Sequence, residues 1–147
     1  MANPVSLLFL CTGNSCRSQM AEGWLRHRWP QQYKAFSAGI ETHGLNPNAV
    51  RAMAEAGIDI SDQQSQHIDE FAAEKLDYVI SVCGHADEHC PVFPGDTTRL
   101  HHAFDDPPKL AANAASDEEA MQHYRRVRDD IQRFVEHLPD WLEDNVR

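Results

Sequence analysis

The chain has 147 residues, of which 41% are hydrophobic and 24% are charged. This size and composition predict a single globular domain over residues 1–147 and exclude collagen-like or disordered proteins. The 23 acidic residues outnumber the 13 basic ones, and the net charge of −10 opposes binding to nucleic acid or to anionic membranes. An anionic substrate therefore requires a strong local site.

The amino-terminal half is predicted to contain two strands, each followed by a helix. The apolar run 5–10 predicts a buried strand, and apolar residues at helical spacing predict a helix over 17–29. Residues 33–38 predict a second strand. Asn46-Pro47 is typical of a helix start, and Gly57 is typical of a helix end.

The carboxyl-terminal half continues this alternation with less regular segments. We expect a helix over 67–75, a buried strand over 78–82, an irregular segment over 84–98, a fourth strand over 99–104 and an amphipathic helix from Ala120 to Leu138 that Pro139 kinks. Strands that alternate with helices predict a parallel α/β sheet, which binds ligands beyond the carboxyl ends of its strands. The segments that begin at Cys11, Cys83 and Asp105 all fall at that edge.

The cysteines and the lack of a long apolar run indicate the cellular compartment in which the protein is expected. The run 5–10 is too short for a signal-peptide core or a membrane span, which predicts a cytoplasmic protein. In a reducing compartment, reactive or metal-binding thiols explain cysteines better than structural disulfides do. The chain has four of them: Cys11, Cys16, Cys83 and Cys90.

The loop after the first strand has the features of an oxyanion site. Successive backbone N–H groups that enter a helix amino terminus form an anion cradle, and Gly13 and Asn14 tolerate the left-handed conformations that such a curl needs. The guanidinium of Arg17 can pair with two oxygens of a tetrahedral anion. The predicted oxyanion-binding residues are Thr12, Gly13, Asn14, Ser15, Cys16 and Arg17.

The same loop supplies a candidate nucleophile at Cys11. The positive field of the helix start and of Arg17 is expected to lower the pKa of the Cys11 thiol and hold it as a thiolate. Ser18 is placed to donate a hydrogen bond to that sulfur. The alternative is that Cys11 is an ordinary buried residue at a strand end and that Arg17 is a surface residue.

The segment from Cys11 to Ser18 resembles the catalytic loop of the low-molecular-weight protein tyrosine phosphatases and of the arsenate reductases that share their fold. The likeness extends over nearly the whole chain. The resemblance implies a four-stranded parallel sheet flanked by helices, in a Rossmann-like three-layer α/β/α arrangement. It also implies attack by the loop cysteine on a tetrahedral oxyanion, assisted by an acid in an Asp-Pro pair.

Two further segments separate the branches of this family. Residues 83–91 resemble the redox segment of the thioredoxin-coupled arsenate reductases, and 104–107 resemble their acid loop. The resemblance implies that Cys11 attacks arsenic while Asp106 protonates the leaving oxygen, and that Cys83 then attacks Cys11 and releases arsenite. Cys90 finally attacks Cys83, and thioredoxin reduces the disulfide. A tyrosine phosphatase needs neither distal cysteine.

The chemistry explains why three thiols are useful. Reduction of arsenate takes two electrons, which two thiols supply by becoming a disulfide, and a third thiol can move that disulfide to a place that a reductant reaches. If 83–90 were helical, the Cα atoms of Cys83 and Cys90 would lie roughly 10 Å apart, beyond the disulfide limit of about 7 Å. The segment must therefore change shape during turnover.

Other functions remain open from sequence. One alternative is a protein tyrosine phosphatase with extra cysteines, and another is a non-enzymatic oxyanion or redox sensor. A zinc site is also conceivable, although its spacing differs from the usual Cys-x2-Cys pairing. Its ligands would be Cys83, His85, His89 and Cys90.

No cofactor beyond the external reductant is expected, and the protein is expected to be a monomer. Some relatives in the resembled family bind potassium beside the catalytic loop. Asn14, Glu22 and Ser37 fall at similar positions in this chain, but Gln66 stands where those relatives have an acidic residue. Potassium binding therefore stays doubtful.

Overall fold

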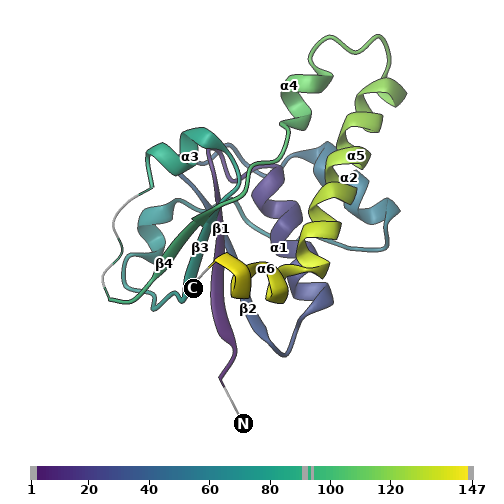
Figure 1. Ribbon diagram of the computed structural model, residues 1–147. Coiled ribbons are helices and arrows are strands. Elements are labelled where there is room, and N and C mark those ends of the chain that lie inside the picture. Colours follow the sequence, from purple (N-terminus) through teal and green to yellow (C-terminus); the bar gives the residue numbers. More distant parts are fainter. Residues whose placement is uncertain (1–2, 91–92, 94, 146–147) are drawn as a thin grey trace.

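The computed structural model describes residues 3–90, 93 and 95–145, and these form a four-stranded parallel sheet flanked by helices. The strand order is β2-β1-β3-β4 (Figure 1). This confirms the predicted α/β fold. The strands are β1 (Val5–Cys11), β2 (Tyr33–Gly39), β3 (Tyr78–Ser81) and β4 (Thr98–His101).

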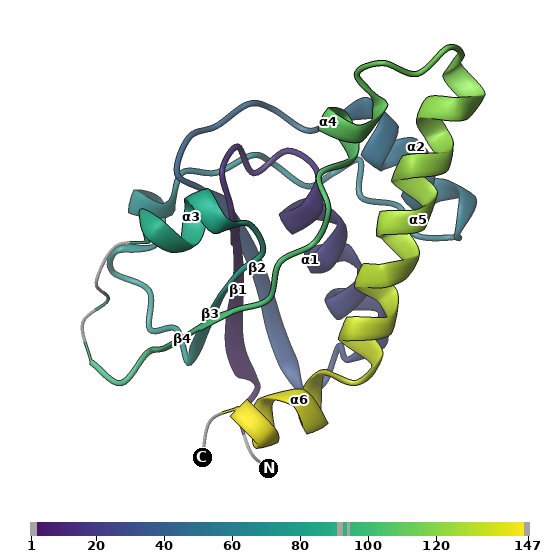
Figure 2. The same ribbon diagram turned by 45° about the horizontal axis from the view of Figure 1, so that its top comes forward.

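The helices lie on both sides of the sheet. Helices α1, α2 and α5 gather on one side, and α3 lies on the other, near the carboxyl ends of β1 and β3 (Figures 1 and 2). The helical elements are α1 (Arg17–Arg28), α2 (Pro47–Glu55), the 3-10 helix η1 (Ile68–Phe71), α3 (Gly84–Glu88), α4 (Pro107–Ala111), α5 (Asp117–Glu136) and α6 (Leu138–Asn145).

Strand β1 is the centre of the core. It pairs with β2 on one edge and with β3 on the other, so the side chains of 7–10 are fully buried. A strand covered on both faces has no polar alternation, which explains the continuous apolar run in the sequence. The register places Cys11, the last residue of β1, opposite Gly39 at the end of β2. The core thereby fixes the position of the loop that follows.

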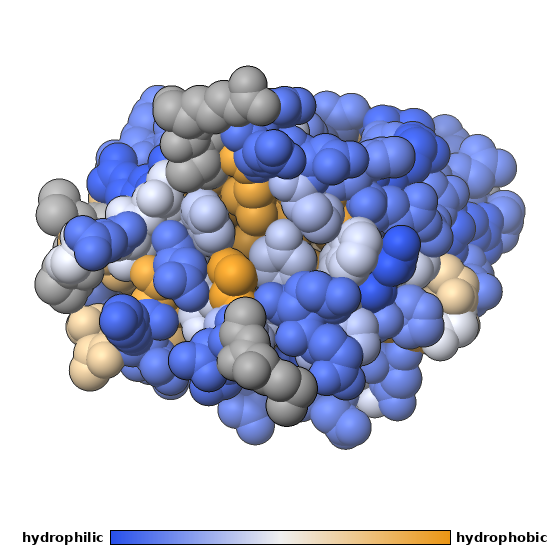
Figure 3. Space-filling model, turned by 60° about the horizontal axis from the view of Figure 1, so that its bottom comes forward, coloured by the Kyte–Doolittle hydropathy of each residue, from blue (hydrophilic) through white to orange (hydrophobic). Residues whose placement is uncertain are grey.

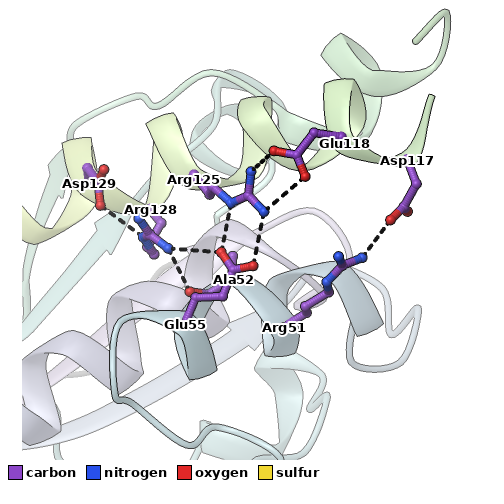
Figure 4. A network of polar contacts seen from close by, with 8 residues as sticks. All are labelled: Arg51, Ala52, Glu55, Asp117, Glu118, Arg125, Arg128 and Asp129. Carbon is purple, nitrogen blue, oxygen red and sulfur yellow. Dashed lines mark hydrogen bonds and ion pairs between the residues drawn. The ribbon is translucent and has the colours of Figure 1, made fainter. Parts of the chain in front are cut away.

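Helices α2 and α5 are joined by a network of ion pairs on the side of the molecule away from α3 (Figure 4). Arg125 of α5 bonds the carboxylates of Glu55 and Glu118, and Arg51 of α2 pairs with Asp117. The Asn46 side chain caps the start of α2, and Gly57 follows its end with a φ of 86°. The predicted boundaries of this helix are therefore confirmed.

Two predictions in the middle of the chain are wrong in extent. The helix expected over 67–75 is only the single turn η1, which His67 begins with a capping box. The segment 84–98, expected to be irregular, begins with helix α3 because the Cys83 sulfur accepts the Ala86 N–H and caps its amino end. Residues 91, 92 and 94 of that segment lie outside the described residues.

The carboxyl-terminal third also differs from the prediction. Strand β4 ends at His101, and the chain then turns into α4, which the sequence analysis missed and which Pro107 begins at the first helical position. The long closing helix is confirmed as α5, but this helix ends before His137, and a separate helix, α6, begins after it. Pro139 therefore lies in the first turn of a new helix instead of kinking an old one.

The surface is largely polar, as the composition suggests. The end of the molecule opposite the carboxyl edge of the sheet is mostly hydrophilic, with a small apolar strip near its centre (Figure 3). Among the described residues, Leu110 is the single large hydrophobic side chain that is classed as exposed. None of the helices in the described part of the chain is long and apolar enough to cross a membrane.

Candidate active site

The loop between β1 and α1 lines a pocket at the carboxyl edge of the sheet. Strand β1 delivers Cys11 to this edge, and α1 begins six residues later at Arg17 (Figure 2). The pocket has a volume of about 380 Å³. It is lined by Cys11, Thr12, Gly13, Ser15, Cys16, Arg17, His43, Asn46, Asp106 and Pro108.

The backbone carbonyl groups of this loop accept hydrogen bonds from another segment, whereas its N–H groups are available to bind a ligand. The segment 40–46 donates N–H groups to four loop carbonyls, at distances of 2.8–3.2 Å. Those carbonyls belong to Cys11, Thr12, Gly13 and Ser15. Within the described residues, the backbone N–H groups of 13–17 have no protein acceptor. A run of such groups at a helix start can bind anions, so anion binding by this loop stays a prediction.

Asn14 holds the curl of the loop. It is fully buried and adopts a φ of 46°, the left-handed conformation that the sequence predicted for it. Its Nδ2 donates to Ser18 Oγ at 3.0 Å, and its Oδ1 accepts from Gln66 N at 2.7 Å and from Gln19 Nε2 at 3.1 Å. In this bond the Ser18 hydroxyl oxygen is the acceptor, so its proton is still available, and the predicted hydrogen bond from Ser18 to the Cys11 sulfur stays a prediction.

Gly13 is needed for space and not for a left-handed conformation. Of the two residues that tolerate a left-handed conformation, Asn14 adopts one and Gly13 does not. A Cβ at Gly13 would lie 2.3 Å from Nδ1 of His43, whose ring packs against the loop. His43 in turn is held by Glu41, whose Oε2 lies 2.7 Å from its Nε2. A side chain at residue 13 would therefore displace a wall of the pocket.

Arg17 connects the cradle to the acid loop. Its guanidinium donates to the Phe104 carbonyl at 3.0 Å through Nη1, and Nη2 lies 3.6 Å from Asp106 Oδ2. The two aspartates of this loop have different surroundings. Asp106 lines the pocket, whereas Asp105 pairs with Arg126 of α5 at 2.9 Å and is largely exposed. Of the two aspartates, Asp106 is the one that lines the pocket, and its role as the proton donor stays a prediction.

Cys83 lies against the loop cysteine. The two sulfurs are 3.7 Å apart, and Cys83 Sγ also contacts Thr12 Oγ1 at 3.2 Å and the Ala86 N–H at 3.4 Å. Hydrogen bonds from Cys11, Thr12 and Ala86 stabilise a negative charge on this sulfur, and Arg17 adds to their effect. Together they lower the pKa of Cys83 to about 5. In this arrangement Cys83 is the thiolate of the pair.

The expectation of a lowered pKa at Cys11 is wrong in this arrangement. The hydrogen bond that its thiol donates to Cys83 and the burial of its side chain both raise the pKa of Cys11. Arg17 lowers the pKa of Cys11, but its effect is smaller. The reason is tertiary, since a thiol proton shared by two close sulfurs stays on the one that receives fewer hydrogen bonds.

The remaining two cysteines are not brought into contact with this pair. Helix α3 separates Cys90 from Cys83, and Cys90 is half-buried, with a pKa raised mainly by burial. Cys16 is buried beside the pocket, and burial raises the pKa of its thiol to about 12. The four cysteines are not joined by disulfides in this structure. The structure thus assembles the first two thiols of the predicted relay and keeps the third apart.

Neither of the metal sites considered from the sequence is supported. At the candidate potassium site the carboxylate is already bonded to protein groups, and the candidate zinc ligands are not brought together as a metal site. Glu22 accepts the Ser37 hydroxyl at 2.7 Å and is paired with Arg26, while its pKa is raised by burial. A buried carboxylate that already has a cationic partner is a poor site for potassium. Among the described residues, no group of three or more His, Cys, Asp or Glu side chains is arranged to hold a metal, so the zinc alternative receives no support.

Sequence reasoning missed several residues of the site. His43 and Pro108 form walls of the pocket, and Gln19, fully buried, donates to both the carbonyl and the side-chain oxygen of Asn14. Gln63 donates in turn to Gln19 Oε1 at 2.8 Å. The sequence did carry a signal for Gln19, which is a polar residue on the inward face of a predicted helix. Burial of such a side chain is favourable only when it has a buried hydrogen-bond partner.

Comparisons with known proteins agree with this geometry. The arsenate reductase of Halalkalibacterium halodurans is 52% identical over 129 residues, which cover 88% of this chain and 91% of that protein. The arsenate reductase of Bacillus subtilis is 51% identical over 125 residues, covering 85% and 88% of the two chains. A solved structure of an arsenate reductase in the oxidized state superimposes with a TM-score of 0.74 and 32% identity, covering 90% and 95% of the two chains. Residues 6–147 match the model of the low molecular weight phosphotyrosine protein phosphatase family, and the chain belongs to that family.

Proposed function

We propose that this protein reduces arsenate to arsenite through Cys11, Cys83 and Cys90. The observation that carries the proposal is the 3.7 Å contact between the sulfur of Cys83 and that of Cys11, which lines the pocket of the loop. A phosphatase that acts through one cysteine has no use for a second thiol in that position. The arsenate reductases that this chain resembles at about half of all aligned positions support the same substrate.

The first step joins the substrate to the protein. Arsenate binds in the loop with its oxygens on the backbone N–H groups of 13–17 and on the Arg17 guanidinium. Attack by Cys11 requires that its proton leave, and the Cys83 sulfur is the acceptor in contact with it. Asp106 protonates the departing oxygen, which leaves as water. Cys11 then carries arsenic in a covalent adduct.

The next two steps move electrons and then the disulfide. Cys83 passes the proton that it took from Cys11 to an oxygen of the departing arsenite and attacks the Cys11 sulfur as a thiolate. The sulfur–arsenic bond breaks, and its electron pair leaves with arsenic as arsenite. Cys90 then attacks Cys83, which returns Cys11 to the reduced state and leaves a Cys83–Cys90 disulfide. We propose thioredoxin as the reductant of this disulfide, and the cytoplasm as the compartment, because the relay requires an external supply of reducing thiols.

A second activity, hydrolysis of aryl phosphates, is favoured by one specific observation. Cys11, Arg17 and Asp106 are arranged together without help from the distal cysteine, and the family to which the chain belongs is named for this reaction. We propose residual phosphatase activity beside arsenate reduction. We also propose that the protein is a monomer and that it takes part in arsenic detoxification.

The experiment that tests the proposal compares two reactions in single cysteine variants. Cys11→Ser is expected to abolish arsenate reduction and aryl phosphate hydrolysis, because a serine hydroxyl is much less acidic than a thiol and a weaker nucleophile. Cys90→Ser should keep the phosphatase activity, release one equivalent of arsenite and stop with a Cys11–Cys83 disulfide. The measurements are arsenite released, thioredoxin oxidised and the disulfide located by mass spectrometry.

Three outcomes contradict the proposal in different ways. Sustained thioredoxin-driven turnover by Cys90→Ser removes Cys90 from the mechanism. Phosphatase activity without any arsenite release by the native protein supports a tyrosine phosphatase instead. Tight arsenate binding without either product is the behaviour of an oxyanion sensor.

A further inference from the structure

The third thiol can act only after the segment between Cys83 and Cys90 changes shape. Helix α3 occupies residues Gly84–Glu88 of that segment. A helical path over these seven steps separates the two Cα atoms by roughly 10 Å, whereas a disulfide requires less than about 7 Å. The transfer of the disulfide therefore depends on how firmly α3 is held.

One contact that holds α3 depends on the redox state of Cys83. The Cys83 sulfur accepts the Ala86 N–H at 3.4 Å and is the amino-terminal cap of the helix. A thiolate is a strong acceptor for such a bond, and a disulfide sulfur is a weak one. When Cys83 joins Cys11 in a disulfide, this cap weakens at the moment when α3 has to open.

A second set of contacts does not depend on Cys83. Asp87, the next to last residue of α3, accepts a hydrogen bond from the hydroxyl of Ser81 at 3.0 Å. Ser81 is the last residue of β3 and is 2% exposed, so this bond joins the helix to the buried end of the strand. His101 Nδ1 lies 2.8 Å from the same hydroxyl oxygen and 3.9 Å from Asp87 Oδ1.

The proton count of these three residues fixes the direction of the bonds. Ser81 has one hydroxyl proton, and the Asp87 carboxylate only accepts. Since the hydroxyl donates to Asp87, with the Leu100 carbonyl at a longer 3.3 Å, His101 Nδ1 must be the donor to Ser81 Oγ. A chain of two donated bonds therefore runs from β4 through β3 to α3. It ends on a charged acceptor, which makes its last bond stronger than a neutral one.

We propose that Ser81, Asp87 and His101 form a latch that keeps α3 helical and sets the rate at which Cys90 reaches Cys83. The latch residues are positioning residues, and the inference rests on the proposed function. In the step that they control, Cys90 Sγ attacks Cys83 Sγ, the Cys83–Cys90 bond forms and the Cys11–Cys83 bond breaks. Cys11 leaves as a thiolate and regains a proton equivalent to the one that Cys90 loses.

The test measures the two disulfides separately in latch variants. Ser81→Ala removes the shared hydroxyl, and Asp87→Asn removes the charge of its acceptor. Glu88→Gln is the matched control, because Glu88 is an exposed carboxylate on the same helix. Each reduced protein receives one equivalent of arsenate, is quenched and alkylated over time, and is mapped by mass spectrometry. A second measurement follows hydrogen exchange of the amides of 84–88 before arsenate is added.

The expected result is a split between the two steps. The Cys11–Cys83 disulfide should form at the native rate in all variants. Its conversion to Cys83–Cys90 should be about ten-fold faster in Ser81→Ala and Asp87→Asn, the factor that loss of one hydrogen bond to a charged group produces. Amide exchange in α3 should rise by about the same factor. Glu88→Gln should match the native protein in both measurements.

The outcomes that overturn the latch differ from those that overturn the proposed function. If the native protein makes the Cys83–Cys90 disulfide but Ser81→Ala and Asp87→Asn make it no faster, the latch is wrong and the relay stands. Accelerated conversion in Glu88→Gln also removes the latch, since any charge on α3 would then serve. If the native protein never forms that disulfide, the proposed function fails and the role of the latch fails with it.

Discussion

The oxyanion loop and the redox segment follow neighbouring strands and contact each other through Cys11 and Cys83, yet they are held very differently. The loop after β1 has its carbonyl groups bonded to 40–46 and its curl fixed by the buried side chain of Asn14. Helix α3, after β3, has five residues, of which Ala86 alone is buried. Contact density of this kind separates rigid from mobile parts of a fold. One region therefore presents fixed dipoles to the substrate, and the other has to move during turnover.

The largest expected effect tests whether the fixed region includes the acid loop. Asp106→Asn should slow the chemical step by roughly 10²–10⁴-fold, the usual range for loss of a general acid. Asp105→Asn is the matched control, because Asp105 faces Arg126 and not the pocket. Single-turnover arsenite release measures the step. A crippled Asp105→Asn beside a nearly normal Asp106→Asn would show that the wrong aspartate was chosen.

A smaller effect tests how much the rigidity of the loop contributes to anion binding. Asn14→Ala loses three hydrogen bonds and places an alanine in a left-handed conformation, so the cradle should lose its shape. We expect affinity for inorganic phosphate to fall by about 10- to 100-fold, which corresponds to loss of one or two hydrogen bonds. Calorimetric titration measures it, with the exposed Asn113→Ala as control. Native affinity in Asn14→Ala would contradict the role of this side chain.

The smallest effect concerns the contact between the two regions. With its pKa at about 5, Cys83 should be ionised at neutral pH, and the ultraviolet absorbance of its thiolate should disappear as the pH falls through about 5. Cys83→Ser should lack this transition. The hydrogen bond from Cys11 is the largest cause of the low pKa, so in Cys11→Ala the transition should move to higher pH. An unchanged transition in Cys11→Ala would mean that Thr12 and α3 alone stabilise the thiolate.

Local sequence signals determined much of the fold. The apolar run of β1, the helical spacing of α1 and the Asn46-Pro47 start of α2 all describe contacts within a few residues of the chain, and each element formed near its predicted place. The placement of Cys11, Cys83 and Asp106 at one edge also followed, since parallel strands carry their loops to the same side. The signals failed for α3 and α4, whose five residues are too few for a period to be read.

Only the tertiary structure decided which sulfur carries the charge. The sequence placed a positive field at Cys11, and that inference considered only the loop and the helix that follows it. Cys83 is 72 residues away along the chain, yet its sulfur accepts hydrogen bonds from the Cys11 thiol and the Ala86 N–H and contacts the Thr12 hydroxyl. The pKa of a buried group depends on every donor and charge within a few ångströms. Such neighbours come from packing, which no local pattern in the sequence specifies.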